Sequence, residues 1–327
     1  MRAAREAAGI SLSSMATRTH YSKTYLWQLE AGERVVKPEH VTAYATALGI
    51  PVNTLYGSPL EPLWTLWDAR DDLPGEAERD RVTALLDRPR SVDQTALGTL
   101  ADVLAVVRRI EDDAGADHVI PLVDAQVKLV EQLAEEARSS VRSVAVGLLS
   151  ELEQYRGWLA IPGQQWTPAG AHLDRAAVLA LEADDPLRLS TALSFSAYRA
   201  IRRRNFRTAD ALSDAAQRDT RVHLGLRTYE TFQRAEILAR LRERAEALRL
   251  LSATDSMIEH LPPADELPPS GYWYTAPFFL GQRAFVLNAL GDHTAAGQAA
   301  RDCLAEMPPA WTSSEWASRR RELAELT

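Results

Sequence analysis

The chain has 327 residues, of which 46% are hydrophobic and 25% are charged, the composition of an ordinary globular protein. No apolar run approaches the roughly 20 residues of a membrane span, and the N-terminus lacks the apolar centre of a secretion signal, so we expect a cytoplasmic protein. Its single cysteine, Cys303, excludes disulfide frameworks and cysteine-based metal sites within one chain.

The charge is unevenly distributed. The net charge of −8 argues against a chain that coats nucleic acid indiscriminately, but residues 1–56 carry six basic and four acidic side chains. A mildly basic head on an acidic body fits a localised phosphate-binding patch. Only three of the 37 basic residues are lysines, a bias that indicates a high-GC bacterial gene.

The first 57 residues predict a domain of five short helices. The first four span residues 1–8, 12–19, 23 to 30 or 31, and 38–48, and the fifth is a short turn over residues 54–56 that Asn53 caps. Ser11 and Ser22 are the expected N-caps of the second and third helices, and Gly9, Gly32 and Gly49 are the expected stops. Helices this short persist only by packing, and the expected core comprises Met15, Ala16, Leu26, Leu29, Val41, Tyr44, Ala45, Leu48 and Leu55.

The second and third predicted helices, joined by a tight turn, have the spacing of a helix-turn-helix. The residues RAAREAAGISL at 2–12, MA at 15–16, YSK at 21–23, LWQLEAG at 26–32, Ala45 and LGI at 48–50 resemble the phage-repressor (XRE-type) helix-turn-helix family. Three positions depart from its pattern. His20 replaces the usual turn glycine, and Leu12 replaces a frequent glutamine. Met1 falls where the family has an apolar residue inside its first helix, which leaves room for a natural start upstream of it. Spacing alone would also allow a helical bundle with no role on DNA.

The resemblance implies that the third helix enters the major groove of double-stranded DNA. Lys23 would then reach guanine or a phosphate, Gln28 an adenine edge, and Thr24 a thymine methyl or a phosphate. Trp27 either packs on the DNA or folds back on the domain, and we favour the second. The expected phosphate contacts are the helix starts at Ser11 and Ser22 and the side chains of Arg18, Arg34 and Lys37.

Residues 51–62 are rich in proline and glycine and predict a hinge after the first domain. The segment over residues 58–90 is expected to connect the two domains, and it contains a loop at residues 71–75. Beyond it, residues 91–327 have helical periodicity throughout, and no stretch alternates with the period of a strand. We therefore expect an all-α protein in which a helix-turn-helix domain precedes an α-solenoid. Residues 93–138 would supply one or two degenerate helix pairs.

A pattern of small residues recurs in this second region. A small residue is followed by another 12 positions later and a third after seven more, in the sets Gly157/Ala169/Ala176, Ala197/Ala209/Ala216, Ala235/Ala247/Thr254 and Ala284/Ala296/Cys303. Turn-forming residues precede the second member in the last three sets. The pattern resembles the tetratricopeptide repeat, a pair of antiparallel helices that cross closely at small residues. It predicts a curved array with a concave groove.

By register, the groove should be lined by Tyr198, Arg202, Tyr229, Phe232, Glu236, Arg240, Phe278, Phe285 and Asn288. Rings, arginines and an amide suit a peptide or a small amphiphile as effector. Each ring is equally well explained as a packing residue, and the arginines are better explained as solvated charges.

The seven histidines lack metal-ligand spacing, and we find neither a phosphate-binding glycine loop nor a nucleophile elbow, so we predict no metal, no cofactor and no catalysis. The architecture resembles peptide-responsive quorum-sensing regulators, which implies a homodimer reading a pseudo-palindrome. The alternatives are a scaffold whose repeats dock a partner protein, with DNA binding secondary or lost, and an enzyme with an unrecognised pocket.

Overall fold

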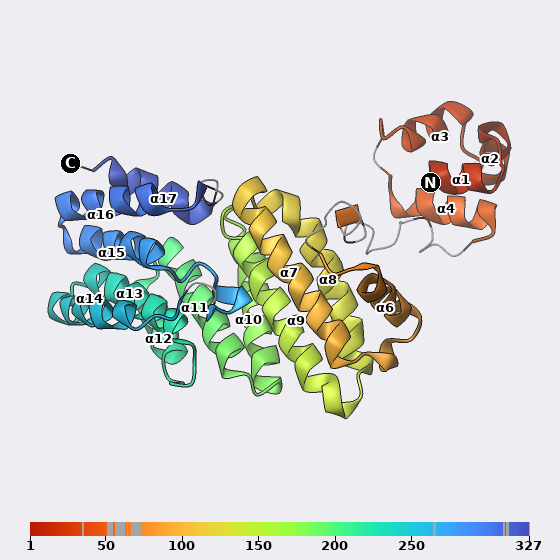
Figure 1. Ribbon diagram of the computed structural model, residues 1–327. Helices are drawn as coiled ribbons and strands as arrows, with labels where there is room; N and C mark the ends of the chain where they lie inside the picture. Colours follow the sequence, from red (N-terminus) through yellow and green to blue (C-terminus); the bar gives the residue numbers. More distant parts are fainter. Residues whose placement is uncertain are drawn as a thin grey trace. The chain divides into compact units, whose positions relative to one another are not determined.

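The computed structural model describes residues 1–34, 36–50, 55, 63, 65–66, 73–263, 266–309, 311 and 314–326. Every regular element in these ranges is a helix, as the sequence predicts (Figure 1). The chain divides into two compact units, Met1–Thr65 and Leu66–Thr327.

The first unit contains the four longer helices that the sequence predicts: α1 (Arg2–Ala7), α2 (Leu12–Thr19), α3 (Lys23–Glu30) and α4 (Pro38–Leu48). The hydroxyls of Ser11 and Ser22 accept hydrogen bonds from the backbone N–H groups of Ser14 and Tyr25, so both predicted caps are confirmed. Gly49 ends α4 in the left-handed conformation at φ +68°. Of the predicted core, Ala16 and Leu48 are partly buried and the other members are buried. In the predicted fifth helix only Leu55 falls within the described residues.

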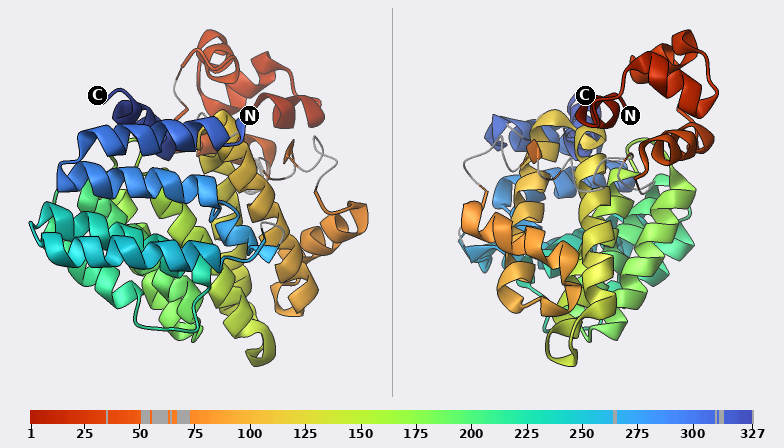
Figure 2. Two further views of the ribbon diagram at one scale, coloured as in Figure 1. Left: turned by 60° about the vertical axis from the view of Figure 1, so that its left-hand side comes forward. Right: turned by 90° about the vertical axis from the view of Figure 1, so that its right-hand side faces the viewer.

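The second unit consists of helices that pack antiparallel to their neighbours in chain order (Figures 1 and 2). It begins with α6 (Glu76–Asp87), which lies in the predicted connecting segment, and η2 (Pro89–Ser91), which ends one residue beyond it. The helix pairs that follow are α7 (Gln94–Ala114) with α8 (Ala116–Glu136), α9 (Ser139–Leu159) with α10 (Trp166–Glu182), α11 (Pro186–Arg202) with α12 (Phe206–Ala216), α13 (Leu224–Arg240) with α14 (Arg244–Glu259), and α15 (Ala276–Leu290) with α16 (His293–Glu306). The region predicted to hold degenerate pairs forms one pair, α7 with α8.

The small residues of the repeat pattern are the crossing points of the last four pairs. All twelve are buried, and a Cβ atom added to Gly157 would lie 2.8 Å from Cγ of Leu173. A bulkier side chain there would push α9 away from α10. The same register is held by buried hydroxyls, because Ser150 donates to the carbonyl of Ala176 and Ser190 to that of Ala216.

The turn inside each of these pairs has one geometry. Gln164, Arg204, Arg242 and Gly291 all have a positive φ, and each lies five residues before the second small residue of its set. The N–H of the next residue reaches back to a carbonyl five residues earlier, as Asn205 does to Ala200. This is the hydrogen bond of a left-handed helix ending, and it reverses the chain in a few residues.

The unit ends with α17 (Glu315–Ala324), which the sequence reading missed. It packs on α16 and α15, and Tyr198 of α11 donates a hydrogen bond of 2.7 Å to Glu315. A second long-range contact joins Tyr272, which follows the 3-10 turn η4 (Pro269–Gly271), to Asp112 of α7. The array therefore curves until parts far apart in the sequence meet. Among the described residues no helix is long and apolar enough to cross a membrane.

Candidate functional sites

The turn between α2 and α3 keeps helix-turn-helix geometry without its usual glycine. His20 adopts the left-handed conformation, with φ 59° and ψ 18°. This conformation costs a residue with a side chain roughly 1–2 kcal/mol. The departure from the family pattern therefore leaves the geometry intact and costs stability.

The outer face of α3 is exposed on the first unit. Lys23, Thr24 and Trp27 are exposed and Gln28 is half-buried, whereas Leu26 and Leu29 anchor the helix in the core. The expectation that Trp27 folds back on the domain is wrong, because its side chain remains 50% exposed. Leu26 and Leu29 occupy the core-facing side of α3. Trp27 lies about 100° around the helix from Leu26, on the side away from Leu29, and so points outward.

The residues predicted to contact phosphates differ in how exposed they are and in the contacts they already make. Arg34 lies with its guanidinium carbon 4.6 Å from the centre of the Tyr25 ring, beside α3. Lys37 is exposed just before α4. Arg18 donates to the carbonyl of Ala47 at the end of α4, which ties α2 to α4 and uses part of its donor capacity. Ser11 and Ser22 are exposed at the starts of their helices.

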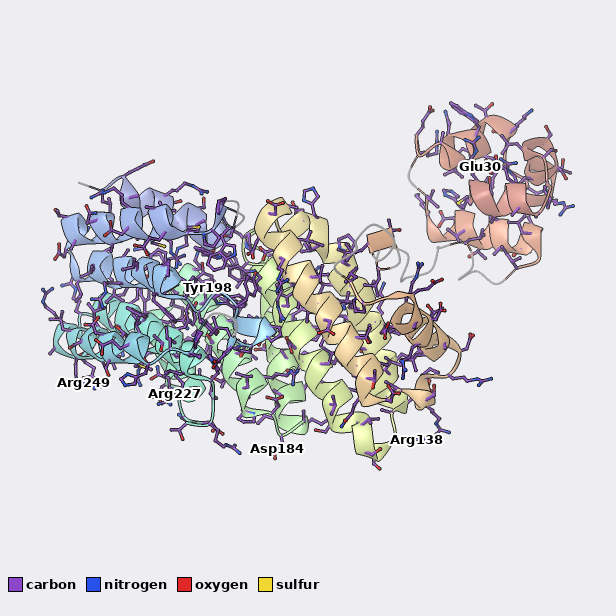
Figure 3. All side chains as sticks on the ribbon, in the orientation of Figure 1. Glu30, Arg138, Asp184, Tyr198, Arg227 and Arg249 are labelled. Atoms are coloured by element: carbon purple, nitrogen blue, oxygen red, sulfur yellow. The ribbon has the colours of Figure 1, made fainter. Side chains whose placement is uncertain are left out.

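Sequence reasoning missed the ion pair that fixes α3 from behind. Arg5 of α1 donates two hydrogen bonds of 2.7 Å to the carboxylate of Glu30, which also accepts one from Tyr44. Glu30 lies inside the unit in Figure 3. Burial acts to raise the pKa of Glu30, but the hydrogen bonds from Arg5 and Tyr44 outweigh it, and the net pKa is lowered. The pair joins α1, α3 and α4.

The second unit contains a partly open cavity of about 60 Å³ on its concave side. Its wall comes from α7, α9, α11, α13, α15, α17 and the loop after η4. The wall is mainly aromatic: the lining residues are Arg108, Glu111, Asp112, Gln154, Tyr155, Trp158, Phe195, Tyr198, Tyr229, Tyr272, Trp273, Tyr274, Phe278, Gln282, Phe285, Trp316 and Arg319. Tyr198, labelled in Figure 3, lies among these crowded side chains.

Two adjacent carboxyl groups of α7 face this cavity. Glu111 accepts hydrogen bonds from Trp158 at 3.4 Å and Tyr155 at 3.5 Å, and Asp112 accepts one from Tyr272. Burial raises the pKa of Glu111 to about 7, with a further increase from the charge of Asp112. Burial likewise raises the pKa of Asp112 to about 6. Both carboxyl groups therefore hold their protons to a higher pH than solvated carboxyl groups do.

The cavity contains four of the nine predicted groove residues, namely Tyr198, Tyr229, Phe278 and Phe285. Arg202, Glu236 and Arg240 instead line a neighbouring open depression, and Arg319 of α17 lies in the wall of both.

Two predicted groove positions have other roles. The prediction for Phe232 is wrong, because the side chain is 1% exposed and stacks on Phe279 inside the core, with ring centres 5.7 Å apart. Asn288 is not in the cavity wall either, and its side-chain oxygen lies 2.9 Å from Nδ1 of His293 at the turn into α16.

The missed wall residues had one detectable sign in the sequence. Three consecutive aromatic residues, at positions 272–274, lie in the proline-rich insertion between the last two repeats. A solvated loop rarely carries such a run, and all three rings line the cavity. Glu111 and Asp112 had no comparable sign, since helix surfaces commonly carry acidic residues.

Residues 1–55 match a family described as a helix-turn-helix domain. The match includes α1 to α4 and the α3 face, and it supports a role in binding DNA. No curated protein and no solved structure matches the chain. Among the described residues no three side chains of metal-binding type come together.

Proposed function

We propose that the protein is a sequence-specific transcription regulator of the phage-repressor type, and that α3 reads bases in the major groove. One observation carries the proposal: in a unit that matches the helix-turn-helix family, α3 presents Lys23, Thr24 and Gln28 outward from a capped, core-anchored helix. Solvated polar residues are usual on any surface helix, so the match to the helix-turn-helix family is what ties this face to DNA.

In this proposal, residues at the centre of the α3 face contact bases and residues at its edges contact the DNA backbone. Gln28 reads adenine, Lys23 reads guanine or holds a phosphate, and Thr24 contacts a thymine methyl or a phosphate. Trp27, half exposed, packs on sugar or a thymine methyl. Arg34 and Lys37 hold the backbone on either side, and Arg18 contributes less because it also binds Ala47.

The second unit is, in this proposal, a tetratricopeptide-type sensor that also pairs two copies of the chain. The support is the buried small residues and the repeated left-handed turns, together with an aromatic cavity on the concave side. A homodimer would place two α3 helices on the two halves of a pseudo-palindrome. The proposal assigns the chain no catalytic step and locates it in the cytoplasm of a bacterial cell.

The test is a gel-shift titration of the full chain on DNA from upstream of its own coding sequence, with scrambled DNA as competitor. We expect selective binding that weakens as salt is raised. Gln28→Ala should reduce the difference in binding free energy between specific and scrambled DNA by about 1–3 kcal/mol. Arg34→Ala should weaken both alike. Equal affinity of the wild type for both DNAs at low salt would refute sequence-specific regulation and favour the scaffold.

A further inference from the structure

We infer that the concave cavity binds a small organic cation with a flat apolar body, of the arylalkylamine class. The inference deepens the proposed sensing role of the second unit and rests on it. It follows from three properties of the cavity: its walls, its charges and its closure.

The walls favour a flat ring with a positive charge. Trp158 packs edge-on against Phe195 at 5.5 Å, and Tyr229 lies 6.1 Å from Phe278. Aromatic faces attract cations as well as apolar groups. A volume of about 60 Å³ corresponds to about five waters, which limits the occupant to a small molecule.

The charges of the wall are balanced except at Glu111 and Asp112. Arg108 is 2% exposed and pairs with Glu151 at 2.9 Å. Arg319 donates to Tyr198 and lies 3.9 Å from Glu236.

No ion pair joins Glu111 or Asp112 to a base anywhere in the described part of the chain. Each of the two is 6% exposed and accepts only from neutral donors. Two adjacent buried carboxyls without a cation lack a counter-charge that an ammonium group would supply.

The closure favours a small occupant over an extended peptide. The hydrogen bond from Tyr198 to Glu315 joins α11 to α17, and the one from Tyr272 to Asp112 joins the loop after η4 to α7. A peptide lying along the concave face would have to break these contacts, whereas a small amine would not need to.

The experiment uses three probes that share one ring and differ in charge: 2-phenylethylamine, 2-phenylethanol and 3-phenylpropionate. Binding to the full chain without DNA is measured by calorimetry and by the rise in Tm. We expect the amine to bind with a Kd on the order of 0.1 mM and the other two at least tenfold more weakly. Binding of the anion or the alcohol as tight as that of the amine would overturn the inference, and so would no amine binding at 10 mM, a concentration about 100 times the expected Kd.

Variants locate the site. Glu111→Gln and Asp112→Asn should each weaken the amine by about tenfold or more, since each removes a charged acceptor. Both should fold, because they neutralise groups that burial already disfavours as charged. The control is Asp113→Asn, which changes the same charge on the exposed side of α7 and should leave the Kd unchanged.

If Asp113→Asn lost as much affinity for the amine as Glu111→Gln and Asp112→Asn, the amine would bind elsewhere and the inference would be overturned. Since DNA is absent from the assay, a negative result here leaves the gel-shift outcome untouched, and the reverse is also true. The two failures are therefore distinguishable.

Discussion

Removing the buried guanidinium of Arg5 should selectively destabilise the helix-turn-helix unit. Arg5→Met keeps the apolar part of the side chain but removes the guanidinium that pairs with Glu30 through two hydrogen bonds. The Glu30 side chain, which is only 4% exposed, then keeps one hydrogen bond, from Tyr44. Breaking a buried ion pair on one side costs about 3–5 kcal/mol. Because Arg5 itself retains 10% exposure, we expect a value near the lower limit, about 3 kcal/mol.

Hydrogen exchange measured by mass spectrometry on the full chain reports this unit separately. A loss of about 3 kcal/mol should accelerate exchange in peptides from α1 to α4 by roughly 150-fold, since about 1.4 kcal/mol is a factor of ten. Peptides from α9 to α16 should keep their wild-type rates, because the hydrogen-bond partners of Arg5, namely Glu6, Ile10 and Glu30, belong to the first unit.

The matched control is Arg2→Met on the same helix. Arg2 pairs with Glu6, but the two side chains are 65% and 53% exposed, so the change should alter exchange by no more than about fivefold. If Arg5→Met and Arg2→Met gave the same exchange rates, the buried pair would not be what holds α3 in place.

Two further predictions concern stability. Burial raises the pKa of Glu230 to about 7, so the folded chain holds a proton that the unfolded chain releases; stability is full below the unfolded pKa and falls as pH rises through 7. Between pH 5 and 8, Glu230→Gln should therefore lose up to about 3 kcal/mol less free energy of unfolding than the wild type. Measurement of Tm against pH tests this, and a pH dependence identical to that of the wild type would contradict it. His20→Gly should slow exchange across α2 and α3 by about fivefold, about 1 kcal/mol, because glycine adopts the left-handed conformation freely; faster exchange would show that the imidazole contributes contacts we have not assigned.

The first unit could be predicted almost to the residue because its determinants are local. Ser11 and Ser22 cap the helices that directly follow them, and Gly49 ends the helix that directly precedes it. The repeat register was predictable for a related reason. Helices can cross closely only where both carry small side chains, so the spacing of Ala197 and Ala209 encodes the geometry of their pair.

The cavity was only half predictable, because curvature decides which residues meet. Trp158 contacts Glu111 across 47 positions and Tyr272 contacts Asp112 across 160, and neither separation leaves a periodic trace. The helical register also assigned one residue to the wrong face of its helix. Phe232 lies about 60° around the helix from Tyr229, which is enough to turn its ring from the concave face into the contact with Phe279.

The excess of arginine over lysine, which the sequence suggests only as a trait of the gene, has a structural consequence in the second unit. Arginines join neighbouring helices there: Arg156 of α9 binds Asp124 of α8, and Arg188 of α11 binds Glu151 of α9. Arg320 of α17 is fully buried, and its guanidinium lies 4.3 Å from the centre of the Trp316 ring. A planar guanidinium can stack on a ring and donate in several directions, whereas an ammonium group is more strongly hydrated and resists such burial. The small residues thus set the crossing within each pair, and the arginines hold successive pairs in the curve that encloses the cavity.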